Sequence, residues 1–145
     1  MVVDDEPSNL FTFQRALRSE FDVVMASEPE EALGLLSRRS FDVLVLDFAM
    51  PGMNGQQLLE KARAIDPDIP CIFVTAYAEL HSVRDAARNN GVVKLLMKPW
   101  EKDTLTRWLY HCTSMVRMKK TVGRLQMEPG MSESSSDSKC GSGTD

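Results

Sequence analysis

The segment DVLVLDFAMPGMNG, residues 42–55, places a charge at the end of an apolar run. Val43 to Leu46 are strand-forming residues without polar alternation, which predicts a strand buried on both faces. The run ends at Asp47, whose carboxylate burial would penalise. It then enters Met-Pro-Gly, which continues neither a strand nor a helix. Such a carboxylate needs a chemical reason for its position.

Short apolar runs and helical patterns alternate on both sides of this segment. Further strands are expected at residues 1–3, 21–26, 71–76 and 92–97. Helices are expected at residues 7–19, 28–39, 55–65, 79–91 and from Pro99 to about residue 126. The alternation predicts an α/β fold, in which a parallel sheet carries helices on both faces.

Composition limits the classes of protein to consider. The chain has 145 residues, of which 43% are hydrophobic, enough for one core. The net charge is −4, and four acids and one base from residue 127 onward account for −3 of it. The remaining body is nearly neutral, so we expect no direct nucleic-acid binding. Three scattered cysteines without a CxxC pair predict neither disulfides nor zinc, and a cytoplasmic location is expected.

The chain divides by composition into a globular domain, 1–112, a helical extension, 113–126, and a tail, 127–145. The tail is rich in Ser, Gly and acid and is expected to be disordered. It offers no second core, so we expect either a stand-alone domain or part of a larger protein. Strands usually run about 5–6 residues, but the first one has only three residues before Asp4. We therefore expect the sequence to begin inside that strand.

Polar side chains follow four of the expected strands. Asp4 and Asp5 end the first, Asp47 the third, Thr75 the fourth and Lys98 the fifth. The carboxyl ends of parallel strands meet at one edge of a sheet, where such folds bind ligands. We therefore expect these side chains to converge.

Three acids together need a counter-charge, and Mg²⁺ prefers oxygen ligands. Asp5 and Asp47 suit direct ligation, Asp4 suits a role through water, and the backbone carbonyl of Ala49 is a further candidate. Asp47 is also the natural nucleophile for a phosphoryl group.

Two more groups complete the chemistry that we expect at this edge. Lys98 would hold phosphoryl oxygens during the attack of Asp47, and the Thr75 hydroxyl would donate a hydrogen bond to the attached group.

The motifs VVDDE, LVLDFAMPGMNG, VTAYA and KPW, within residues 1–112, resemble the response-regulator receiver domain (CheY-like superfamily) of two-component signalling. The resemblance implies a flavodoxin-like (βα)5 fold with sheet order 2-1-3-4-5, Mg²⁺ as cofactor, and a phosphohistidine donor on a sensor histidine kinase or phosphotransfer protein. It also implies Asp47 as phosphoacceptor, Thr75 as switch hydroxyl and conformational signalling to a downstream protein partner or an output domain, with no turnover of external substrates.

One position departs from that pattern. Family members usually carry Tyr or Phe three residues before the lysine, and here Leu95 stands there. Tyr77, two residues after Thr75, is the candidate substitute.

The last helix carries a stripe at steps of three or four, namely Trp108, His111, Met115, Met118, Val122 and Leu125. Between residues 104 and 126 it holds five bases and no acid. The stripe predicts a homodimer through the extended helix, and the resemblance implies a second route, through the face of the fourth helix, fifth strand and fifth helix. The alternatives are a solvated extension and a basic amphipathic helix that lies on an anionic surface.

Two other functions remain open. A pseudo-receiver would bind partners without phosphorylation. A magnesium phosphohydrolase of the haloacid-dehalogenase type would need a second Asp two residues after the nucleophile, where this chain has Ala49.

Overall fold

The computed structural model describes residues 1–76 and 80–127, and in the last helix it describes side chains up to residue 119 and at residue 121. Its internal contacts divide the chain into two units, Met1–Thr113 and Ser114–Asp145. Within the described residues, no helix combines the length and the apolar character that crossing a bilayer requires.

A five-stranded parallel sheet forms the centre of the first unit, in the order β2-β1-β3-β4-β5. The strands are β1 (Val2–Val3), β2 (Met25–Ala26), β3 (Leu44–Asp47), β4 (Cys71–Thr75) and β5 (Lys94–Met97). This order confirms the expected flavodoxin-like topology. Every residue of β3 is buried, as the apolar run predicted for its first three residues.

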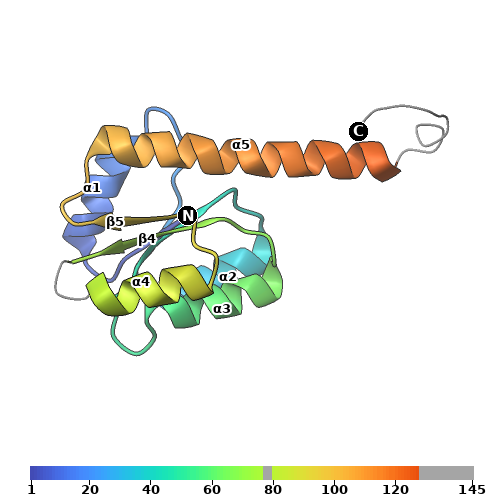
Figure 1. The fold of residues 1–145 in the computed structure, drawn as a ribbon. Coiled ribbons are helices and arrows are strands. Elements are labelled where there is room, and N and C mark those ends of the chain that lie inside the picture. Colours follow the sequence, from blue (N-terminus) through green and yellow to red (C-terminus); the bar gives the residue numbers. More distant parts are fainter. Residues whose placement is uncertain (77–79, 128–145) are drawn as a thin grey trace. The chain divides into compact units, whose positions relative to one another are not determined.

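The helices alternate with the strands along the chain and are α1 (Pro7–Leu17), α2 (Pro29–Arg38), α3 (Gly55–Ile65), α4 (Leu80–Asn89) and α5 (Lys102–Met127). α2, α3 and α4 cover one face of the sheet, and α1 and the first part of α5 cover the other (Figure 1).

Successive strand residues feed two separate cores. Leu44, Leu46 and Phe73 pack with α2, α3 and α4, whereas Val45 and Ile72 pack with α1 and α5. The split follows from the alternation of side chains along a strand. Both cores bury mainly aliphatic residues, which holds the polar strand ends in fixed positions.

The expected strand at residues 21–26 is too long, because β2 covers only Met25–Ala26. β2 is an edge strand that pairs with β1 alone, so its ladder cannot exceed that of β1. Two further hydrogen bonds flank the paired residues, from the Val2 amide to the Val24 carbonyl at 2.8 Å and from the Asp4 amide to the Ala26 carbonyl at 3.2 Å.

The loop after β3 is tied closely to the start of α3. Asn54 caps the helix by accepting from the Gln57 amide at 2.9 Å, and the Gln57 side chain accepts from the Asn54 amide at 2.9 Å. The Gly55 amide donates to the Phe48 carbonyl at 2.8 Å. A Cβ on Gly55 would lie 3.0 Å from the Phe48 Cα and 3.2 Å from the Asp47 carbonyl oxygen, so glycine permits this approach.

Candidate functional site

Three carboxylates meet at the carboxyl edge of the sheet. Asp4 and Asp5 follow β1, and Asp47 ends β3, the strand that pairs with β1. One oxygen from each lies within 4.8 Å of the others. Asp4 is fully buried and Asp47 is 6% exposed, whereas Asp5 is not buried. The topology therefore brings together the acids that the sequence analysis singled out.

Lys98 supplies the cation within hydrogen-bonding or ion-pair range of two of these acids. Its Nζ lies 3.4 Å from Asp47 Oδ1 and 3.8 Å from Asp4 Oδ2, and its side chain is 30% exposed. One ammonium does not balance three carboxylates. The cluster therefore keeps an excess of negative charge.

The electrostatics of Asp47 reflect this imbalance. Burial, and next the neighbouring Asp4, raise the pKa of Asp47 from 3.8 to about 6. The Lys98 ammonium and a hydrogen bond from the Ala49 backbone amide act in the opposite direction. A carboxylate that is costly to ionise, beside two others, fits a hard divalent cation. The donor set consists of oxygens only, as Mg²⁺ requires.

Thr75 ends β4 at the same edge and is fully buried. In the register of β3 and β4, Asp47 pairs with Val74, so Thr75 lies one position further along. Its Oγ1 donates to the Ala76 carbonyl at 3.2 Å, and its own carbonyl accepts from the Lys98 amide at 2.8 Å. The backbone of Thr75 thus links the fourth strand to the lysine.

The sequence analysis also singled out Ala49, Leu95 and Tyr77. The Ala49 amide contacts Asp47, while its carbonyl as a metal ligand stays a prediction. Leu95 is half-buried, pairs with Phe73 and packs against the core under α2, α3 and α4. Tyr77 lies outside the described residues.

Asn9 is a site residue that the sequence analysis missed. Its Nδ2 lies 3.3 Å from Asp4 Oδ1, 3.2 Å from Asp4 Oδ2 and 3.0 Å from Glu6 Oε1. The Glu6 amide also donates to Asp4 Oδ1, at 2.9 Å. The available signal was Pro7, which favours a helix start immediately after the acidic pair and so places first-turn donors over Asp4.

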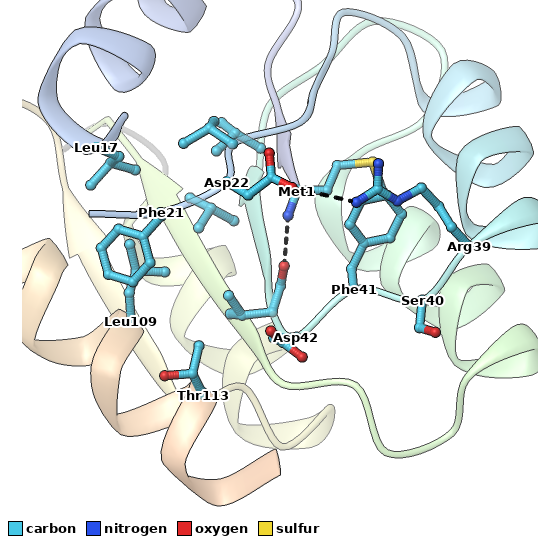
Figure 2. A pocket seen from close by; sticks show the side chains of 14 residues that line it. Met1, Leu17, Phe21, Asp22, Arg39, Ser40, Phe41, Asp42, Leu109 and Thr113 are labelled. Atoms are coloured by element: carbon cyan, nitrogen blue, oxygen red, sulfur yellow. Dashed lines mark hydrogen bonds and ion pairs between the residues drawn. The ribbon is translucent and has the colours of Figure 1, made fainter. Parts of the chain in front are cut away.

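A separate pocket of about 160 Å³ lies near the opposite edge, where β1 and β3 begin (Figure 2). The Met1 amine donates to the Val43 carbonyl at 2.8 Å, and Arg39 lies 3.8 Å from Asp22. Neither Lys98 nor any of the three clustered carboxylates lines it. This pocket is therefore distinct from the candidate site.

Related proteins are found by sequence. The sequence model described as the response regulator receiver domain matches residues 1–110. The transcriptional regulatory protein GlrR of Escherichia coli K12 is 35% identical over 106 residues, which are 72% of this chain and 24% of that protein. The chain spans about a quarter of the length of such curated relatives.

Similar solved structures agree with this match. The response regulator receiver domain protein (CheY-like) from Methanospirillum hungatei JF-1 has a TM-score of 0.74 and 27% identity, over 81% of this chain and 94% of that chain. The receiver domain of sensor histidine kinase PA1611 from Pseudomonas aeruginosa PAO1 has a TM-score of 0.70 and 25% identity, over 78% and 94%. That structure holds a magnesium ion coordinated in its active-site cleft.

Proposed function

Because this chain belongs to the response regulator receiver domain family, with a role in two-component signalling, we propose that it accepts a phosphoryl group on Asp47. The observation that carries the proposal is the placement of the Asp47 carboxylate, 3.4 Å from the Lys98 ammonium and beside two further acids. A nucleophile, a cation for phosphoryl oxygens and a set of oxygen ligands then occupy one strand edge.

Asp4, Asp5, Asp47 and the Ala49 carbonyl would hold Mg²⁺, with Asp4 acting through water. When bound, Mg²⁺ supplies positive charge for the phosphoryl oxygens and lowers the cost of ionising Asp47. The oxygen-only donor set and the raised pKa of Asp47 support this assignment. The magnesium-bound receiver domain of Pseudomonas aeruginosa supports it by analogy.

Phosphoryl transfer needs an ionised Asp47. One carboxylate oxygen attacks the phosphorus of a phosphohistidine, the new P–O bond forms as the P–N bond breaks, and the imidazole leaves and takes a proton from solvent. Lys98 holds the transferred oxygens, and the Thr75 hydroxyl donates to the product. The donor is a sensor histidine kinase or a phosphotransfer protein.

The phosphoryl group then shifts a two-state surface that a downstream partner or an output domain reads. Leu95 is aliphatic, so the switch operates without a rotating aromatic ring at that position. Self-association through α4, β5 and α5, or through the extension of α5, is part of the same proposal. The exposed Met97 and Met118 side chains support those two routes, respectively.

Incubation with acetyl phosphate and MgCl2, followed by intact mass spectrometry, tests the function. We expect the mass of one added phosphoryl group, lost in Asp47→Asn and lost on chelation. Asp68→Asn, which removes an exposed acid, is the matched control and should gain the group normally. A folded wild-type protein that gains nothing contradicts the proposal and favours a pseudo-receiver.

A further inference from the structure

Lys98 lies where the chain leaves the sheet. Lys98 directly follows the last residue of β5, and its amide donates to the carbonyl of Thr75 at the end of β4. The next helix, α5, begins only at Lys102. The intervening residues belong to neither element, and Pro99 has no amide hydrogen to donate. The position of the Lys98 ammonium therefore depends on what holds this short segment.

An aromatic stack ties the segment to α1. The rings of Trp100 and Phe13 have centroids 4.5 Å apart and planes inclined by 22°. Phe13 is 2% exposed in the core between the sheet, α1 and α5, and Trp100 packs at the edge of that core. Stacked aromatic rings prefer a defined geometry, so this contact fixes orientation as well as distance.

The same face of α1 contacts the acidic cluster. Asn9 precedes Phe13 by one helical turn and donates to both carboxylate oxygens of Asp4. Asn9, Phe13, Lys98 and Trp100 line one surface pocket. Helix α1 therefore makes two contacts that bear on Lys98. Through Asn9 it holds Asp4, a carboxylate partner of Lys98, and through Phe13 it holds the segment that contains Lys98.

We propose that Trp100 is a positioning residue that keeps the Lys98 ammonium beside Asp47 through its stack on Phe13. This inference rests on the proposed function, because it gives Trp100 a part in phosphoryl transfer although Trp100 contacts no reacting atom. Loss of the stack frees the segment, and a displacement of about 1 Å can cost up to about 100-fold in rate.

The placement of Lys98 can be read without any phosphoryl transfer. Trace acetylation with acetic anhydride and peptide mass spectrometry compare the labelling of Lys98 with that of the exposed Lys61. Trp100→Leu keeps an apolar side chain without the stack, and Trp100→Phe keeps an aromatic ring. Trp108→Leu is the matched control, because Trp108 lies 5.1 Å from the Lys94 ammonium instead.

An amine that is partly buried and paired with two carboxylates is less accessible to the reagent than one released into solvent. We expect several-fold faster labelling of Lys98 in Trp100→Leu, and wild-type labelling in Trp100→Phe and Trp108→Leu. Phe13→Leu breaks the same stack from α1 and should behave like Trp100→Leu, which provides a second variant if the first does not fold. Unchanged labelling in a folded variant without the stack overturns the inference.

The rate of phosphoryl uptake from acetyl phosphate with MgCl2 forms the second arm. The maximal rate should fall by about tenfold or more in Trp100→Leu, with the half-saturating donor concentration within about twofold and recovery in Trp100→Phe. A wild-type rate in Trp100→Leu overturns the positioning role. If wild type takes up no phosphoryl group, the proposed function fails, and the labelling result still decides whether Trp100 positions Lys98.

Discussion

Replacing Asp47 with asparagine should stabilise the fold at neutral pH when no divalent cation is present. Burial and the neighbouring Asp4 raise the pKa of Asp47 from 3.8 to about 6. The native state therefore holds this proton more tightly than the unfolded state, and stability falls as the pH rises from 3.8 to about 6. At about 1.4 kcal/mol per pH unit, ionising Asp47 in the native state costs about 3 kcal/mol.

Asparagine has a similar shape and no charge to desolvate, but Lys98 then loses one of its two acidic partners. We expect the free energy of unfolding of Asp47→Asn to exceed that of wild type by about 1–3 kcal/mol at about pH 7.5 in chelator. Below about pH 3.8 the difference should shrink toward zero, because Asp47 then holds its proton in the unfolded state as well as in the native state.

Urea unfolding followed by circular dichroism at both pH values measures this difference. Asp68→Asn removes an exposed acid and should stay within about 0.5 kcal/mol of wild type. Magnesium should reverse the order at neutral pH, because a cation that binds only the native state stabilises it and wild type keeps all three acids. The reasoning is refuted if wild type is more stable than Asp47→Asn in chelator at neutral pH, or if the difference in free energy of unfolding does not change with pH.

Two further substitutions test how the site is held. Gly55→Ala should destabilise by about 1–3 kcal/mol, because its Cβ would meet the Phe48 backbone at 3.0 Å. In Gly34→Ala the nearest neighbour of the new Cβ would be a side-chain atom at 3.9 Å, so this change should instead stabilise α2 by about 0.5–1 kcal/mol. Urea unfolding measures both changes, and equal effects would contradict the close approach of Gly55 to the Phe48 backbone. Lys98→Met should raise the pKa of Asp47 above about 6, because the Lys98 ammonium lowers that pKa in the wild type. NMR titration of the carboxyl carbon in chelator measures the pKa, and an unchanged value would contradict the prediction.

Much of the fold follows from local patterns in the sequence. The apolar run before Asp47 predicted a buried strand, and strict alternation of strands and helices predicted a parallel sheet. The strand order came from the family resemblance. Because parallel strands end at one edge, the same reading placed Asp4, Asp5 and Asp47 together.

Other features depend on contacts that no local pattern encodes. The short β2 results from its only partner, β1, whereas the sequence of residues 21–26 favours a longer strand. Asn9 reaches Asp4, and Phe13 reaches Trp100, because α1 packs at a particular distance from the strand ends. Helix packing of this kind follows from the whole core. Pro7 could indicate donors in the first turn of α1 near Asp4, but the sequence could not single out Asn9 among them or pair Phe13 with Trp100.

The identity of the phosphorylated residue can be measured directly. After incubation with acetyl phosphate and MgCl2, borohydride reduces an acyl phosphate to an alcohol, and peptide mass spectrometry locates the altered side chain. Our account predicts modification at Asp47 alone, and none after chelation. Modification at Asp4 or Asp5 with Asp47 intact, or no modification of a folded protein, would contradict it.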